Sequence, residues 1–144
     1  MQFLRVLNFL IGFSLIFLAS CCGFFLAKDS SYALLLKKEL LSSWAYLLQK
    51  SAHAHTNLFG FLHIAFGQTL ASSKCSLKWK IAQTVGLFLG SFAMSFLLLF
   101  RSHFPVSPGA FDIMGYTIAF FLSFSLLALA SHSFGLLRKL ISLS

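Results

Sequence analysis

The segment Ser51-Ala-His-Ala-His-Thr-Asn-Leu-Phe-Gly-Phe-Leu-His-Ile-Ala-Phe-Gly-Gln-Thr-Leu70 has the length of one helical crossing of a lipid bilayer. It nevertheless contains three of the five histidines of the chain, namely His53, His55 and His63. An ionisable side chain is costly in hydrocarbon, so such residues either face a neighbouring helix or form a functional site. The segment therefore predicts a helix that carries polar groups into the interior of a membrane bundle.

The composition of the whole chain is that of an integral membrane protein. Of its 144 residues, 58% are hydrophobic and only 10% are charged, whereas a soluble domain has about 25% charged residues. The net charge is +8, and the basic residues lie between apolar runs. This placement suits contact with the anionic headgroups of a lipid bilayer, so nucleic-acid binding is not expected.

Four apolar runs, each close to the ~20 residues that cross a bilayer, occupy residues 3–27, 53–71, 81–100 and 111–137. Lipid cannot hydrogen-bond to the backbone, so each run is expected to be helical. The chain is thus predicted to be an all-α integral membrane protein, a four-transmembrane-helix bundle forming one domain over residues 1–144. Leucines at helical spacing with Trp44 and Tyr46 predict an amphipathic interfacial helix within residues 28–50, between helices 1 and 2.

Basic residues predict the orientation of the helices. If the N-terminus is cytoplasmic, the inner segments carry six basic residues and the outer segments five. Both termini are therefore expected to be cytoplasmic. The sequence Leu18-Ala19-Ser20-Cys21 also resembles a lipoprotein cleavage site, but the chain stays apolar up to Ala27, which favours a retained first helix. Whether Cys21 is a lipidation site stays open.

Histidines near the outer ends of the helices form the candidate site. His53 and His55 begin the second predicted helix, His103 follows the third, and Asp112 precedes the fourth on the same side. Neutral imidazole binds haem iron, copper and zinc, and a carboxylate can orient such a ligand. The metal-site hypothesis is thus His53, His55 and His103. The alternative is that the histidines are structural polar groups.

A polar and small-residue stripe runs along the second predicted helix. At ~100° per residue, its members share one face: His53, Thr56, Gly60, His63 and Gly67, with Asn57 at the margin. Such glycines allow another helix or a flat cofactor to approach closely. The pair Gly86 and Gly90 predicts a second close-packing face on the third helix.

The sequence Ala52-His-Ala-His-Thr-Asn-Leu-Phe-Gly60 resembles the H-A-H-x-N-L-x-G segment of small bacterial four-helix membrane proteins that are similar to subunit I of haem-copper oxidases. It also resembles the start of the second helix in the cbb3-type oxidase core. The resemblance covers some 20 residues and implies that His55 is an axial ligand of a b-type haem. His53, His63 and Asn57 are the other candidate cofactor-binding residues. The resemblance also implies a location in the bacterial inner membrane.

Several functions follow as hypotheses. The first is haem b, or copper or zinc, bound for electron transfer or for haem and metal handling. The second is an accessory or scaffolding subunit that packs, as a homodimer or within a larger membrane complex, through the glycine faces. A third is a proton-linked or solute transporter with its path through His63. Catalysis is not expected, because the chain has no GxSxG, P-loop or HExxH motif and no complete catalytic site.

Overall fold

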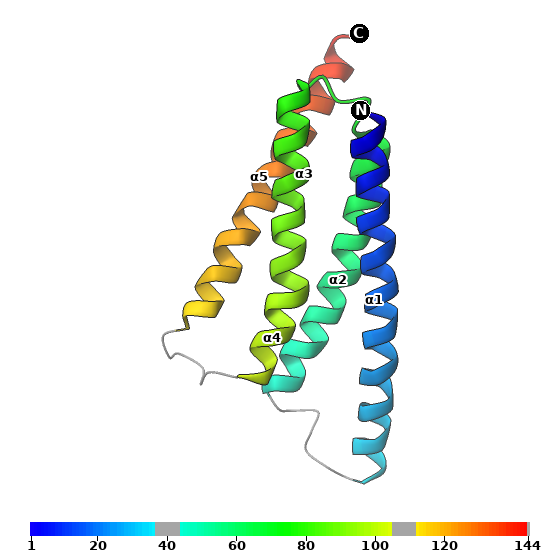
Figure 1. The fold of residues 1–144 in the computed structure, drawn as a ribbon, viewed down its shortest axis with the longest axis vertical. Helices are drawn as coiled ribbons and strands as arrows, with labels where there is room; N and C mark the ends of the chain where they lie inside the picture. The colour runs from blue at the N-terminus through cyan, green and yellow to red at the C-terminus, as the bar shows by residue number, and fades with distance from the viewer. Residues whose placement is uncertain (37–43, 105–111, 144) are drawn as a thin grey trace.

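The computed structural model describes residues 1–36, 44–104 and 112–143, and within these ranges the chain is helical without any strand. The elements are α1 (Gln2–Leu35), α2 (Trp44–Thr69), α3 (Leu77–Phe92), the π-helical η2 (Ala93–Leu97), α4 (Leu98–His103) and α5 (Ile113–Ile141). Since α3, η2 and α4 follow without interruption, Leu77–His103 forms one continuous rod. The helices α1 and α2, the α3–η2–α4 segment and α5 run in alternating directions, so both termini and the α2–α3 turn lie at one end (Figure 1). We call this the terminal end and the opposite one the loop end.

Three helical stretches are long and apolar enough to cross a membrane: Gln2–Tyr32, Leu77–His103 and Ile113–Ile141. This confirms the prediction of an all-α membrane protein. The 34 residues of α1 correspond to about 50 Å of helix, which exceeds the ~30 Å hydrocarbon core of a bilayer.

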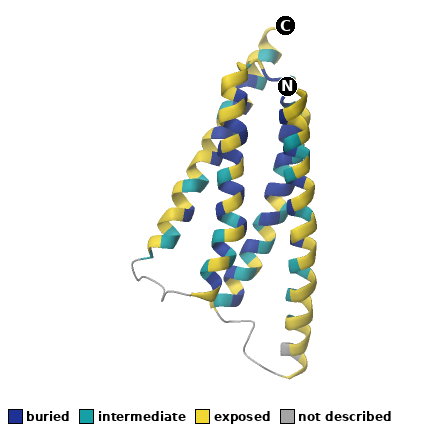
Figure 2. Cartoon of the chain, in the orientation of Figure 1, coloured by how far each residue is buried: buried dark blue, intermediate teal, exposed yellow. Residues whose placement is uncertain are grey.

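Helix α2 is the centre of the bundle. It packs along α1 on one side and against α4 and η2 on the other, while α3 packs along α5. Its buried residues include Thr56 and His63. Buried positions concentrate on α2 and α3, whereas α1 and α5 present exposed outer faces (Figure 2). The lower hydropathy of α2 therefore follows from its position, because its polar groups meet protein rather than lipid.

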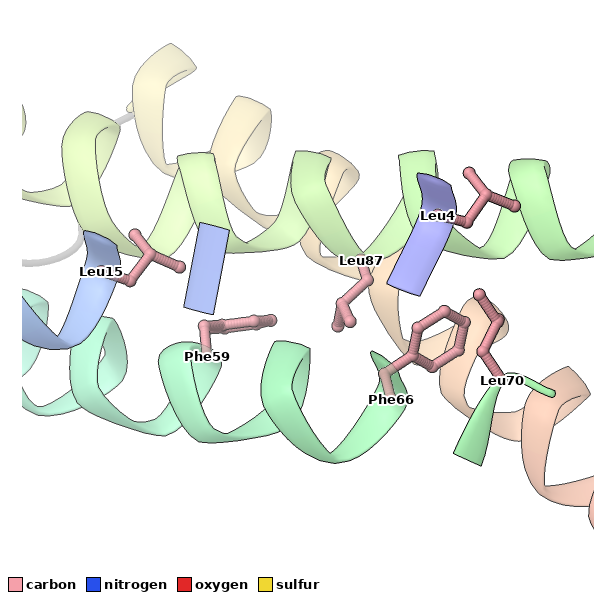
Figure 3. Packing of buried hydrophobic residues seen from close by; sticks show 6 residues of the cluster. All are labelled: Leu4, Leu15, Phe59, Phe66, Leu70 and Leu87. Atoms are coloured by element: carbon pink, nitrogen blue, oxygen red, sulfur yellow. The ribbon is translucent and has the colours of Figure 1, made fainter. Parts of the chain in front are cut away.

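The apolar core has two clusters. The first lies between α1, α2 and α3 toward the terminal end (Figure 3) and contains Leu4, Leu15, Phe59, Phe66, Leu70 and Leu87. The second lies toward the loop end, where α2 meets η2, α4 and α5, and contains Leu48, Ala52, Ala93, Leu98 and Ile118. Both clusters are crossed by polar contacts, described below.

Glycines set how closely the helices approach. A Cβ atom on Gly12 would lie 2.7 Å from the backbone oxygen of Gly60, and one on Gly60 would lie 3.0 Å from the backbone oxygen of Gly12. On α3, Gly86 faces the backbone of Phe124, and Gly90 faces Ser125. The predicted close-packing faces of the second and third helices are therefore occupied by α1 and α5 of the same chain, and they are not open to another subunit.

The connection between α1 and α2 differs from the predicted interfacial helix. Residues 28–35 continue α1 and residues 44–50 begin α2, so both flanks belong to the long helices. The central residues 37–43 lie outside the described part of the chain. A hydrogen bond between the hydroxyl groups of Ser30 and Tyr46 joins the two helices at this end.

Candidate functional site

His63 lies at the centre of the bundle, with a fully buried side chain. Its Nδ1 is 2.8 Å from Oδ1 of Asn8 on α1, and its Nε2 is 3.3 Å from Oγ of Ser91 on α3. The side-chain amide of Asn8 in turn donates to the Leu4 carbonyl at 2.8 Å and to Oγ1 of Thr84 at 3.3 Å. This network, formed by Asn8, His63, Thr84 and Ser91, joins three helices.

The network determines how the His63 ring is protonated. Because the amide nitrogen of Asn8 donates to two acceptors, its oxygen is an acceptor, and His63 must present Nδ1–H to it. The neutral ring then has its lone pair at Nε2, which is in contact with Oγ of Ser91 at 3.3 Å. The single hydroxyl proton of Ser91 is shared between this nitrogen and the Phe88 carbonyl, 2.8 Å from the same Oγ. Both ring nitrogens thus have partners, and in this arrangement neither is free to bind iron or another metal.

Asn8 and Ser91 were not among the residues singled out from the sequence. Asn8 is fully buried in a helix that is mostly apolar up to Ala27. A lone amide inside a membrane-length apolar run is costly without a partner, and that property is the signal by which it could have been found. Its pairing with His63 depends on how α1 packs against α2.

His53 bonds across the loop-end half of the bundle. Its Nδ1 donates to the Ala19 carbonyl of α1 at 2.9 Å. The ring rests on Gly23, where a Cβ atom would lie 2.7 Å from Cε1 of His53. His53 lines a pocket of about 170 Å³ between α1, α2 and η2, which Cys22, Asp29 and Ser95 also line.

His55 has a different environment. Its Nδ1 donates to the Ser51 carbonyl within α2 at 2.7 Å. The ring is half-buried, and among the described residues none bonds to its Nε2. A backbone carbonyl at Nδ1 with a free lone pair at Nε2 is the usual arrangement of a metal-binding histidine. Asn57, two residues on, is half-buried and has no hydrogen-bond partner for its side chain within the described ranges.

The predicted outer carboxylate has another partner. Asp112 forms an ion pair with Arg101 of α4 and caps α5 by accepting from the backbone N–H groups of Met114 and Gly115, both at 3.1 Å. The N–H of Gly115, with the charge of Arg101, lowers the pKa of Asp112. Arg101 also lies over the Trp44 ring, 5.9 Å from its centroid. Asp112 therefore joins the ends of α4 and α5, and His103, the last residue of α4, is exposed.

The remaining histidine joins α5 to α2 near the terminal end. Nε2 of His132 is 2.9 Å from Oγ1 of Thr69, and its ring lies against Phe66 with the centroids 4.3 Å apart. The His132 side chain is buried.

The candidate ligands are thus distributed rather than gathered. In the described ranges, no three side chains of the metal-binding types His, Cys, Asp and Glu lie together in a way that could hold a metal ion. The pocket beside His53, at about 170 Å³, is smaller than the ~300–1,000 Å³ of ordinary small-molecule sites. This pocket is therefore too small for a porphyrin, and His55 is not among the residues that line it.

One face of α1 is exposed and apolar. Apolar side chains recur there at alternating spacings of three and four residues, at Phe3, Val6, Leu10, Phe13 and Phe17, and Phe24 follows seven residues later. This 3.5-residue period is the pattern of a helix that packs along another helix. We call it the α1 seam.

No known protein family, no curated protein and no solved structure matches this chain.

Proposed function

We propose that the chain is a four-span protein of a bacterial inner membrane, with both termini cytoplasmic, that serves as an accessory or scaffolding subunit of a larger membrane complex. The observation that carries this proposal is the bonding of the histidines. His53, His63 and His132 each bond to another helix of the same chain. Polar groups used in this way hold helices together and leave no free catalytic group at the bundle centre.

The α1 seam is the surface that best suits a partner. Phe13 and Phe17 are 63% and 69% exposed, and the helix packs along α2 on its other side. Large aromatic side chains at heptad spacing offer a continuous ridge to a helix of a partner subunit.

Co-purification tests this function. Tagged protein extracted from its native membrane in a mild detergent is expected to carry stoichiometric partners, measured by light scattering and by protein identification. The F13A/F17A variant should lose most of the partner, whereas F120A/L126A, which removes two similarly exposed apolar side chains from α5, should retain it. A well-behaved monomer without partners would overturn the proposal, and equal recovery from both variants would exclude the α1 seam.

A second candidate function is supported by the environment of His55. We propose that a b-type haem, or copper or zinc, binds at the free Nε2 of His55, with a further ligand from a partner subunit. The hydrogen bond from Nδ1 to the Ser51 carbonyl supports it, as does the resemblance of residues 52–60. When bound, haem or copper would supply electron transfer, whereas zinc, which has no redox chemistry, would be held only for metal handling. In each case the chain would hold and orient the ligand ring.

A reduced-minus-oxidised optical spectrum with metal analysis on the same sample tests this candidate. The expected result is a haem α-band, or stoichiometric copper or zinc, that disappears in His55→Ala. His132→Ala is the matched control, because the His132 ring bonds to Thr69 at the opposite end of the bundle. Protein that stays colourless and metal-free after haem and metal supplementation would refute this assignment and leave the scaffolding proposal intact.

A further inference from the structure

Two adjoining pockets lie between α3 and α5, beginning at the terminal end. The outer one has a volume of about 420 Å³ and the inner one about 340 Å³. They have three lining residues in common: Trp79, Gln83 and Ser131. The pockets therefore form one groove that starts at the helix ends and continues toward the middle of the bundle, which we call the α3–α5 groove.

The mouth of the α3–α5 groove is basic. Lys74 and Arg138 line the outer pocket, and Lys78 lies beside Trp79 on a neighbouring depression. The backbone N–H of Lys74 donates to the Gly135 carbonyl at 3.2 Å, which holds the α2–α3 turn against α5. The described acidic residues, Asp29 and Asp112, both belong to the loop end, so no described carboxylate neutralises this mouth.

The inner half of the groove is apolar. Its walls are formed by Ala82, Gly86, Phe124, Leu127 and Ala128, together with the three shared residues. Because Gly86 has no side chain, α3 lies directly on the backbone of α5 at this point, and the depression remains beside it. An apolar channel of this kind at membrane depth suits a hydrocarbon chain.

An unpartnered polar atom lies where the two halves meet. Gln83 is 2% exposed, and its Nε2 donates to Oγ of Ser131 at 2.9 Å. Its Oε1 is buried without a partner among the described residues. Leaving a buried acceptor unsatisfied is unfavourable. The phosphate and ester oxygens of a diacyl lipid only accept hydrogen bonds, so this oxygen is not a contact that such a lipid could satisfy.

We infer that the α3–α5 groove binds one anionic glycerophospholipid, with its phosphate at Lys74 and Arg138 and one acyl chain in the apolar half. The basic mouth and the apolar inner half agree on this occupant. A free phosphate would leave the apolar half unfilled. The ammonium group of a zwitterionic lipid would meet a basic mouth without any described acid to pair with.

Fluorescence of Trp79 gives a direct test, because Trp79 lines both pockets and the only other tryptophan of the chain is Trp44. The full-length W44F protein is reconstituted into phosphatidylcholine vesicles that contain a small, equal mole fraction of acyl-brominated phosphatidylglycerol or acyl-brominated phosphatidylcholine. Bromine quenches tryptophan on contact. The expected result is several-fold stronger quenching of Trp79 by the brominated phosphatidylglycerol.

Two charge-removing variants distinguish lipid binding in the α3–α5 groove from general electrostatic attraction of anionic lipid to the basic terminal end. K74Q/R138Q in the W44F background should remove the excess quenching by phosphatidylglycerol. R5Q/K139Q removes the same charge from the same end at residues that do not line the groove, and it should leave the excess unchanged. Equal quenching by the two brominated lipids would overturn the inference, as would an equal loss of the excess in both double variants.

Discussion

Nδ1 of His63 lies 2.8 Å from the side-chain oxygen of Asn8, and this contact ties α2 to α1 through the centre of the bundle. Asn8 extends the tie to Thr84, and His63 extends it to Ser91. A buried network in which every member has a partner stabilises one helix arrangement, whereas a partly broken network leaves a costly unpaired group. The polar interior is therefore a means of selecting one packing among apolar helices.

Removing one member of the Asn8–His63 pair leaves the other buried and unpaired. The losses of stability in the two single variants should therefore sum to more than the loss in the double variant. Asn8→Leu leaves Nδ1–H of His63 without its acceptor, and His63→Leu leaves the Asn8 oxygen without its donor. Each is expected to lower the free energy of unfolding by about 1–3 kcal/mol. The N8L/H63L double variant should recover ~0.6–1.7 kcal/mol of the summed loss, the range seen for interhelical hydrogen bonds in membranes.

Unfolding by denaturing detergent, followed by helical circular dichroism, measures this double-mutant cycle. Strictly additive losses would show that the two side chains do not interact. Asn57→Leu serves as the control, because its side chain has no partner among the described residues, and it should show no coupling to His63.

The crossing of α1 and α2 depends on two glycines. Since a Cβ atom on Gly12 would lie 2.7 Å from the backbone oxygen of Gly60, Gly12→Val should force the helices apart at a cost of about 1–3 kcal/mol. Ala27→Val adds a similar volume on an exposed position of the same helix and should be nearly neutral. The same unfolding assay decides, and similar stability of both variants would contradict the close approach.

The cap and ion pair of Asp112 should make stability depend on pH. Because its pKa is lowered in the folded protein, the stabilisation is complete above the unfolded pKa of ~3.9 and declines as the pH falls through the lower folded value. Asp112→Asn keeps a capping oxygen but loses the charge, so it should be less destabilising than Asp112→Ala.

Thermal unfolding at a series of pH values tests this. The difference in midpoint temperature between the wild type and Asp112→Ala should be constant from pH 5 to pH 7 and shrink at lower pH. A difference that grows on acidification would reverse the sign and contradict the assigned role of the carboxylate.

Four membrane crossings require that the two ends of the bundle lie on opposite sides of the membrane. In a chain without native cysteines, a cysteine at Ser142 is expected to react with a membrane-impermeant maleimide only from the cytoplasmic side, and one at His103 only from the outer side. Both positions are exposed. Reaction of both from the same side would contradict the four-span proposal.

The sequence by itself determined the helical class and the membrane setting, because apolar runs of bilayer length leave the backbone no other way to satisfy its hydrogen bonds. It also indicated that the histidines of the second helix are the unusual feature of the chain. Their partners depend on tertiary structure: Asn8 and His63 are 55 residues apart, and only the packing of α1 on α2 brings them together.

The tertiary structure likewise decided the role of Asp112, because its ion-pair partner Arg101 comes from another helix. It decided the glycine faces as well. A small-residue pattern predicts a close helix contact but does not specify the neighbour, and here the neighbours of Gly60 and Gly86 are α1 and α5. The periodicity of a sequence indicates which face of a helix is packed. Which helix packs against that face depends on how all the helices fit together in three dimensions.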